Sequence, residues 1–530
     1  MTIRVYDSLS RQKRDLVPLE PGLVRMYLCG PTVYDDSHIG HLMGPVLFDT
    51  IARWLIARGY RVKFVINITD IDDKIIQRAQ RSGEDWRAIA ERYTTQYFAL
   101  LDELRVVTVT DNPRCTDYVP QMLHFVHDLV AKDRAYVTSD GVYYDVLRQP
   151  GYGKLSGRRV EDMIAGARVE ASEELRHPAD FALWKAAKPG EPTWDSEFGK
   201  GRPGWHLECS VMASELLGET FDIHGGGDDL KFPHHENEIA QSEAHGDHYA
   251  RCWMHNGLVQ YGGKKVAKSD PRMKDPQFAL QFQGRWLLDH HGAPTIRFFL
   301  LRGHYRRPID FEPKNVDAAR TGLIRLLRQL GAIAEEPGQA TLAEIEARDL
   351  PPQAAAHRAR FVAAMDDDFN TAEAIAEIFA MANLAAGLDG DARVQVQRAL
   401  RDLGRLLGLF APGDLARIDR QRDIGAAGRQ VVAAVVDLRN RFRTQKDFAG
   451  ADALRQALAG AGITVKDGAT GAEIAIESDD AVSVLLDRLV ALRDAARARK
   501  DFAGSDAIRD ALTAAGVKLK DGVDGTRWEL

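Results

Sequence analysis

The chain has 530 residues, of which 45% are hydrophobic and 28% are charged; this length exceeds what one hydrophobic core supports and predicts two to four domains. The formal net charge of −7 argues against broad, unspecific nucleic-acid binding, so any contact with RNA must be local. No stretch reaches the roughly 18 apolar residues of a membrane span, and the N-terminal segment lacks the apolar core of a secretory signal. Four cysteines in this length do not make a disulfide framework. We therefore expect a reduced, cytoplasmic protein that binds no membrane.

The first informative stretch covers residues 25–49, where an apolar strand-like run turns through a loop into a helical pattern. The N-terminus of such a helix offers free backbone N–H groups and the positive end of the helix dipole, which suit polyphosphate. His38 and His41 can add hydrogen bonds there, and Gly40 lets the backbone approach a ligand closely. Cys29, just ahead of this histidine pair, is a potential metal ligand.

The next segment predicts the start of a βαβ unit. Residues 64–68 form a continuous apolar run typical of a buried parallel strand, with helical spacing on either side. Asn67, Thr69 and Asp70 fall where this strand ends, the edge of an open α/β sheet at which ligands bind. The carboxylates at residues 72–73 predict a helix start.

Residues 113–199 interrupt this pattern. Residues 118–132 have helical spacing, and residues 135–146 predict a β-hairpin that turns at Asp140 and Gly141. We therefore expect an insertion in the main sheet.

Residues 200–238 contain the densest group of metal-ligand residue types. Pro233 suits the first turn of a helix, and on that helix His234 and Glu238 are four residues apart and project from one face. With Cys29 and Cys209 they supply two thiolates, an imidazole and a carboxylate, a set that can hold Zn²⁺ tetrahedrally. Because the two cysteines are far apart in the sequence, the spacing alone leaves ordinary buried cysteines as an alternative.

Other side chains in this half can complete a substrate site. Trp205 can wall a side-chain pocket, and Asp229 can pair with an ammonium group or a ribose hydroxyl; a core tryptophan and a solvated aspartate are the structural alternatives. Gly226 lies in a run of three glycines that suits a close approach to a base or ribose, although such a run is also typical of a flexible loop. A basic run follows at residues 297–307 and contains Arg302 and Arg306.

The C-terminal half predicts helices and then repeats itself. Helical periodicity at residues 323–330, 358–365 and 371–407 indicates a helical bundle, and residues 411–414 suit a linker. Residues 446–468 then recur at 500–522 with a constant offset of 54 residues, and fifteen of 23 aligned positions are identical. The tail is therefore expected to contain two copies of one small module.

A family resemblance follows from these motifs. The sequence CGPTVYD, from Cys29 to Asp35, followed by HIGH at residues 38–41, resembles the cysteinyl-tRNA synthetases among the class I aminoacyl-tRNA synthetases. The resemblance implies an α/β fold: a Rossmann-like class I catalytic domain with an insertion, a helical bundle, and a duplicated small C-terminal module of the anticodon-binding type. The implied domain ranges are 1–112 and 200–315 for the two catalytic halves, 113–199 for the insertion, 316–410 for the bundle, and 425–477 and 478–530 for the two repeats.

The resemblance also assigns roles to residues. It implies one zinc ion on Cys29, Cys209, His234 and Glu238, catalytic roles for His38, His41, Lys265 and Lys268, ATP contacts at His38, Gly40, His41, Gly226 and Lys268, and cysteine contacts at Trp205 and Asp229. Residues 265–269, KVAKS, resemble the KMSKS loop, whose lysines neutralise charge on the pyrophosphate leaving group. Val266 and Ala267 depart from that motif, and Met43 replaces the usual arginine after HIGH, so altered loop closure is expected.

The implied function is ATP-dependent ligation of L-cysteine to tRNA(Cys) through a cysteinyl-adenylate, with Mg²⁺ accompanying ATP. Zinc would bind the cysteine thiolate, and serine would gain nothing comparable, so no proofreading domain is expected. For tRNA, Arg302, Arg306, Arg527 and Trp528 are the expected contacts; only the second repeat has the arginine and the indole. A monomer is the default.

Two alternatives stay open. One is the related cysteine ligase of mycothiol synthesis, which lacks an anticodon module. The other is a non-catalytic tRNA-binding paralogue whose altered KVAKS loop no longer drives activation.

Overall fold

The computed structural model describes residues 2–160, 174–246, 249–266, 270–468, 471–476, 481–522 and 525–529. The chain divides into two compact units. The first comprises Met1–Leu288 and Ala293–Asp414, and the second comprises Asp289–Gly292 and Leu415–Leu530. Among the residues that the structure describes, no helix is both long and apolar enough to cross a membrane.

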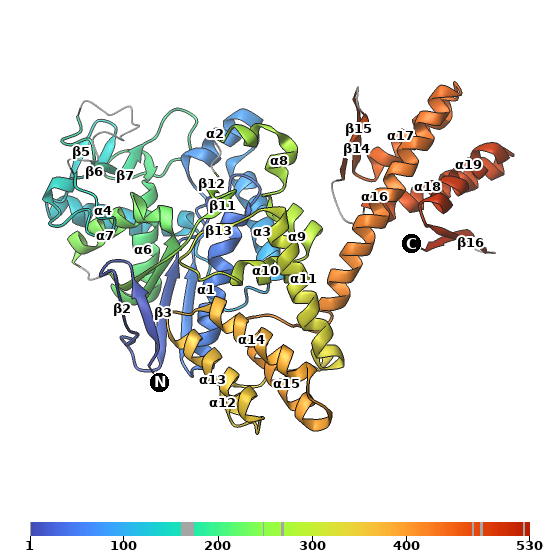
Figure 1. The fold of residues 1–530 in the computed structure, drawn as a ribbon. Coiled ribbons are helices and arrows are strands. Elements are labelled where there is room, and N and C mark those ends of the chain that lie inside the picture. Colours follow the sequence, from blue (N-terminus) through green and yellow to red (C-terminus); the bar gives the residue numbers. More distant parts are fainter. Residues whose placement is uncertain are drawn as a thin grey trace. The chain divides into compact units, whose positions relative to one another are not determined.

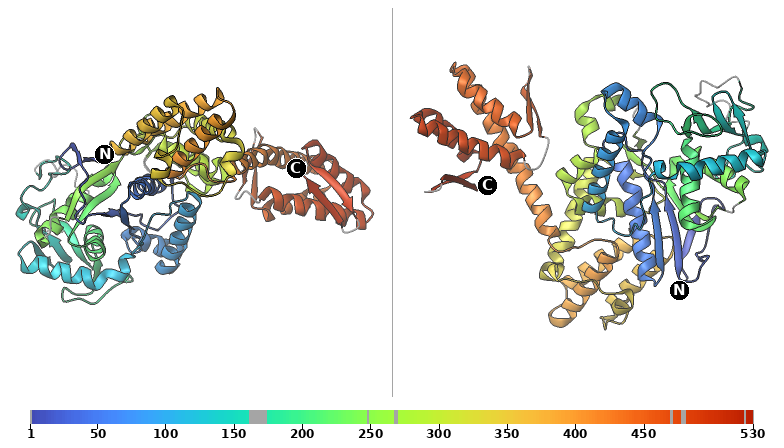
Figure 2. Two further views of the ribbon diagram at one scale, coloured as in Figure 1. Left: turned by 90° about the horizontal axis from the view of Figure 1, so that it is seen from below. Right: turned by 180° about the vertical axis from the view of Figure 1, so that it is seen from behind.

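The first unit is built on a parallel four-stranded sheet (Figure 1). Its strand order is β10 (Tyr249–Asn256), β9 (Thr220–Gly227), β3 (Leu23–Leu28), β4 (Arg61–Ile66). β3 leads through α1 (Ile39–Ala57) to β4, and β9 leads through α7 (His234–His245) to β10 in the opposite direction across the sheet. Right-handed crossovers therefore put α1 and α7 on opposite faces of the sheet. Both views in Figure 2 agree with this placement. This confirms the predicted α/β class and the predicted strand, although β4 ends at Ile66 rather than at Ile68.

The insertion carries its own antiparallel sheet, in the order β5 (Ala135–Thr138), β6 (Gly141–Tyr144), β7 (Phe181–Ala186), β8 (Gly201–Pro203). The predicted helix is α4 (Val119–Ala131), and the predicted hairpin is β5–β6. The turn lies one residue earlier than expected, at Ser139 and Asp140, because Thr138 pairs with Gly141. α6 (Trp205–Leu217) then packs against both α7 and β3.

The remaining elements of the first unit surround this framework. β1 (Arg4–Asp7) and β2 (Gln12–Asp15) pair with each other, and β11 (Val259–Tyr261) lies between β12 (Lys264–Lys265) and β13 (Ile309–Asp310). The helices are α2 (Asp73–Ser82), α3 (Trp86–Glu103), α8 (Pro276–Leu280), α9 (Gly284–His291), α10 (Ala293–Leu301), α11 (Pro313–Leu330), α12 (Leu342–Glu346), α13 (Pro352–Asp366), α14 (Thr371–Ala386) and α15 (Gly390–Leu406). The Asp72 side chain caps α2 by accepting from Lys74 N, which confirms the predicted helix start.

A buried ion pair joins α1 to α10. The Arg297 guanidinium donates to Asp49 Oδ2 over 2.6 Å and to the carbonyls of Leu104 and Leu407. Arg297 is 1% exposed and Asp49 is fully buried. Burial raises the pKa of Asp49, but Arg297 and Arg53 outweigh that effect and hold this pKa below its usual range. The pair therefore ties the helix that begins at His38 to the end of the helical bundle.

The second unit contains the sequence repeat as a structural repeat. The first copy is α16 (Asp414–Thr444), α17 (Phe448–Gly460) and the hairpin of β14 (Ile463–Gly468) and β15 (Gly471–Ile476). The second copy is α18 (Ala481–Ala498), α19 (Phe502–Ala514) and the hairpin of β16 (Lys518–Gly522) and β17 (Gly525–Glu529). The predicted duplication is confirmed down to the backbone, because Lys446 and Lys500 have φ values of 60° and 62°.

The two copies share one hydrophobic core. Leu454 and Leu458 of α17, Leu485 and Leu489 of α18, and Leu512 of α19 belong to the same buried cluster. The copies are therefore not two independent domains.

Removing one partner of the Arg297–Asp49 pair should destabilise the first unit, because the other charge stays buried without its counterpart. We expect Arg297→Met to lower the free energy of unfolding by about 3–5 kcal/mol, measured by urea unfolding followed by tryptophan fluorescence. The control is Arg302→Met, since Arg302 is exposed just beyond α10. Equal stability of the two variants would contradict a structural role for the pair.

Candidate active site and metal centre

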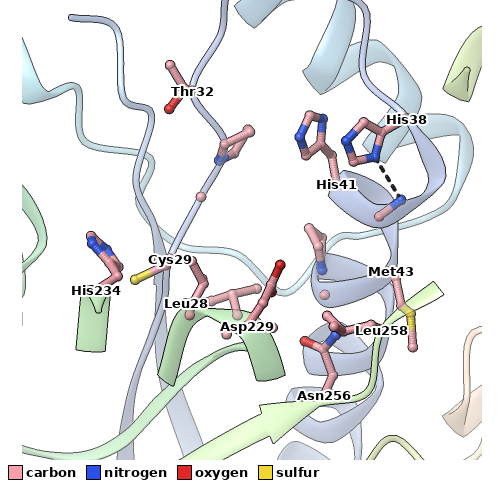
Figure 3. A pocket seen from close by; sticks show the side chains of 18 of the residues that line it. Leu28, Cys29, Thr32, His38, His41, Met43, Asp229, His234, Asn256 and Leu258 are labelled. Carbon is pink, nitrogen blue, oxygen red and sulfur yellow. Dashed lines mark hydrogen bonds between the residues drawn. The ribbon is translucent and has the colours of Figure 1, made fainter. Parts of the chain in front are cut away.

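A cavity of about 440 Å³ opens where β3 and β9 end and α1 begins. Figure 3 shows Cys29 and His234 on one side of it and His38 and His41 on the other. Gly226, Trp205, Asp229 and Met43 also line it. Residues from both predicted catalytic halves of the sequence thus meet in one hollow, at the sheet edge that the strand pattern predicted.

The two histidines are arranged by the start of α1. His38 is its N-cap, and its Nδ1 accepts from Gly40 N over 3.1 Å. The His38 and His41 rings stack with centroids 3.7 Å apart. A Cβ on residue 40 would lie 2.9 Å from His38 Cε1, so glycine is required for this cap as well as for access to the helix N-terminus.

A second cavity of about 430 Å³ adjoins the first and shares His38, Gly40 and Asp229 with it. Its far wall contains Val266, Met273 and Phe282. Val266 belongs to the KVAKS segment, but Lys268 lies outside the described residues. For Lys265 the structure describes the backbone, in β12, and not the side chain.

Cys29, Cys209, His234 and Glu238 converge into a group that can hold a metal ion. The Cys29 and Cys209 sulfur atoms are 3.6 Å apart, and Cys29 Sγ lies 3.5 Å from Glu238 Oε1. Zinc–ligand bonds of about 2.3 Å to sulfur and 2.1 Å to oxygen give tetrahedral edges of about 3.8 and 3.6 Å, and these two separations are close to those values. His234 Nε2 is 3.0 Å from Glu238 Oε1. We call the place between these four ligand atoms the metal point.

Acidic groups crowd this buried point. Burial, together with the Cys209 thiol and the Glu238 carboxylate, raises the pKa of Cys29 well above its usual value. Burial also acts on Cys209, but hydrogen bonding from Cys29 and the charge of His234 outweigh it and lower the pKa of Cys209 to about 6. A divalent cation would relieve this crowding, because it stabilises all three anionic forms together.

A contact on the side of the ring away from the metal point fixes the orientation of His234. Its Nδ1 is 3.0 Å from His206 Nδ1, and burial together with the charge of His234 lowers the pKa of His206 well below its usual value. A neutral His206 can accept the Nδ1–H of His234, which leaves His234 Nε2 for the metal point. Trp205 stacks on His234 with centroids 4.3 Å apart, so it walls the cavity beside the ligand group.

The glycines near the site permit close backbone approach. A Cβ on Gly226 would lie 2.6 Å from the His235 ring, and one on Gly227 would lie 2.8 Å from Asp229 Oδ1. Asp229 is in the short 3-10 helix Asp228–Lys231 and lines both cavities.

The arginines and the tryptophan proposed for RNA contact lie elsewhere. Arg302 is exposed after α10, whereas Arg306 donates to Asp368 over 2.7 Å and lies over the Tyr6 ring. In the second unit, the Trp528 indole donates to Asp487 over 2.7 Å. The Arg527 side chain lies outside the described residues.

Sequence reasoning missed three residues that surround the metal point. His206, His224 and Tyr249 contact the ligand residues, but each lies in an apolar helix or strand segment where it looked like ordinary core. The one available signal was the number of histidines near the proposed ligands, at 206, 224, 234 and 235.

Comparisons with known proteins agree with the fold. Residues 15–321 match the family model described as the tRNA synthetases class I (C) catalytic domain, and residues 360–411 match a DALR domain. A cysteine--tRNA ligase of Geobacter sulfurreducens is 44% identical over 89% of this chain and 99% of its own length. Another, of Pelotomaculum thermopropionicum, is 42% identical over 99% of both chains.

Among solved structures, the LeuRS–tRNA–LeuAMS ternary complex of Agrobacterium radiobacter K84 matches with a TM-score of 0.51 at 14% identity, covering 77% of this chain and 86% of that one. That likeness concerns the fold alone. Because its relatives at this identity and coverage are cysteine--tRNA ligases, the chain belongs to the cysteine--tRNA ligase family of class I synthetases and is an aminoacyl-tRNA ligase.

Proposed function

We propose that this protein activates L-cysteine with Mg·ATP to cysteinyl-adenylate and transfers the cysteinyl group to tRNA(Cys). The observation that carries the proposal is the position of the cluster of Cys29, Cys209, His234 and Glu238, whose first three members line the cavity that the His38–His41 turn also lines. A thiol held at the cluster and a triphosphate held at the turn would bring carboxylate and α-phosphate together.

The proposed zinc ion would bind the thiolate of the substrate and so favour cysteine over serine. Around it, the four ligand residues would fix the position of the thiolate, and Trp205 would wall the pocket beside His234. Asp229 would pair with the α-ammonium group or with a ribose hydroxyl. The contrast between a soft, acidic thiol and a hard, weakly acidic hydroxyl makes selection by coordination strong enough to act without editing.

On the other side of the cavity, His38, Gly40 and His41 would contact the triphosphate at the N-terminus of α1, with Gly226 beside the nucleoside. Lys265 and Lys268 would neutralise the charge that develops on pyrophosphate. For tRNA we propose Arg302, Arg527 and Trp528; Arg306 is already paired with Asp368, so Arg302 is the better candidate on its segment.

One assay separates this function from its rivals. Cysteine-dependent exchange of ATP with pyrophosphate tests activation, and a non-catalytic paralogue would show none. Adding either tRNA(Cys) or an amino sugar as acceptor then distinguishes the synthetase from a cysteine:amino-sugar ligase. Cysteinylation of the sugar instead of the tRNA would overturn the proposal.

Purified protein should contain one zinc ion per chain, because a thiolate-rich site prefers this ion to harder cations. Native mass spectrometry and metal analysis measure the stoichiometry. We expect Cys209→Ala to lose the zinc and Cys252→Ala to keep it, since Cys252 is equally buried but lies outside the ligand group. Absence of zinc from metal-replete protein that still activates cysteine would refute the site.

Lys268→Ala should lower kcat for ATP/pyrophosphate exchange by about 10²–10³, because a lost donor to transition-state charge costs that much. Cysteine affinity should change little. The matched control is Lys264→Ala, an exposed lysine of β12 that we assign no role in catalysis. If Lys268→Ala exchanges at the wild-type rate, other groups have taken over the function of the loop.

Trp528→Ala should raise the KM for tRNA about tenfold or more and leave cysteine activation unchanged, since one base stacked on an aromatic ring contributes about 1–3 kcal/mol. Because the indole also donates to Asp487, Asp487→Ala serves as the control that removes this hydrogen bond and keeps the ring. An equal rise in KM for both variants would assign the effect to packing of the module rather than to stacking.

A further inference from the structure

The two oxygens of the Glu238 carboxylate have different surroundings. Oε1 faces the metal point, 3.0 Å from His234 Nε2 and 3.5 Å from Cys29 Sγ. Oε2 faces away from it and accepts two hydrogen bonds, over 2.8 Å from the Tyr249 hydroxyl and over 2.7 Å from His224 Nε2. Glu238, Tyr249 and His224 are all at most 1% exposed, so these bonds are shielded from bulk solvent.

The direction of the Tyr249 hydrogen bond follows from its partners. The hydroxyl lies 2.8 Å from Glu238 Oε2 and 3.2 Å from the carbonyl oxygen of Cys209, and neither oxygen carries a proton to give. Tyr249 therefore bridges two of the four ligand residues.

The tautomer of His224 follows from the same reasoning. Its Nδ1 is buried and has no hydrogen-bond partner among the described residues, while its Nε2 contacts Glu238. A buried N–H without a partner costs more than a bare lone pair next to apolar atoms. The proton consequently belongs on Nε2, where it is donated to Glu238.

The backbone of Tyr249 carries strain that supports a specific role. Its φ is 41°, in the left-handed region that aromatic residues rarely adopt. The ring is held edge-on to Phe221, with centroids 5.1 Å apart. Packing thus holds the hydroxyl where it meets Glu238, in spite of the backbone cost.

The net charge of the proposed zinc site makes the hydrogen bonds to Glu238 Oε2 important for substrate binding. Two thiolates and one carboxylate around a divalent ion leave a net charge of about −1, and a substrate thiolate would make this buried charge more negative, about −2. Donors on Oε2 withdraw negative charge from Glu238 and also prevent that oxygen from turning toward the metal. Both effects favour a further thiolate at the ion.

We propose that Tyr249 and His224 are positioning residues that hold Glu238 as a one-oxygen zinc ligand and so let the site accept the substrate thiolate. This rests on the zinc site of the proposed function. It adds that residues outside the ligand set determine both metal affinity and the affinity for cysteine.

The test is Tyr249→Phe, which removes only the hydroxyl. Zinc affinity, measured by competition with a chromophoric chelator, should fall about tenfold or more. In protein loaded with Co²⁺ instead of zinc, the absorption band that cysteine adds by thiolate coordination should require a severalfold higher cysteine concentration. His224→Asn should change both titrations in the same direction.

The matched control is Tyr136→Phe, which also breaks a buried tyrosine–carboxylate bond, of 2.7 Å to Asp180, but in the insertion and outside the ligand group. It should retain wild-type zinc affinity and the wild-type cobalt titration. If Tyr249→Phe matches the wild type in both titrations, the inference is overturned while the zinc site stands. If wild-type protein binds no zinc and shows no thiolate band with Co²⁺, the zinc site itself fails and the inference fails with it.

Discussion

The site depends on how closely backbone segments approach at the carboxyl ends of the parallel strands. A Cβ on Gly30 would lie 1.7 Å from the carbonyl oxygen of Asn67, and one on Gly225 would lie 2.2 Å from the Phe48 ring. Gly30 N instead donates to the Asn67 side chain over 2.8 Å, directly beside Cys29. Only glycines permit this approach, which brings the thiol of Cys29, the residue after β3, within reach of ligands on α6 and α7.

The start and the middle of α1 perform separate tasks because different interactions hold them. At its start, the His38 cap and Gly40 leave the helix N-terminus open to the cavity. In its middle, Asp49 and Arg297 fix it to α10 and to the end of α15 through fully buried contacts. An open terminus needs such an anchor, since the hydrogen bonds that would otherwise hold that terminus are kept available for a ligand.

Local patterns predicted the parts of the structure that depend on neighbours in the sequence. The helix carrying His234 and Glu238, the cap at Asp72 and the β5–β6 hairpin were all readable from residues a few positions apart. Long-range pairs were not readable. The basic run at 297–307 suggested an RNA surface, yet Arg297 pairs with Asp49 and Arg306 with Asp368, partners that no local spacing identifies.

The same limit explains why the surroundings of the metal point escaped sequence reasoning while its ligands did not. Ligands must be Cys, His or Glu, and these types are conspicuous in a sequence. The groups behind them need only a proton to donate, so a tyrosine at the start of a buried strand or a histidine within one serves as well as a more conspicuous residue. Tyr249 and His224 became identifiable only when both were found on the same oxygen of Glu238, the one that faces away from the metal point. In a buried anionic site, the identity of the ligands thus specifies which ion can bind, and the hydrogen bonds behind them determine how much further negative charge that ion accepts.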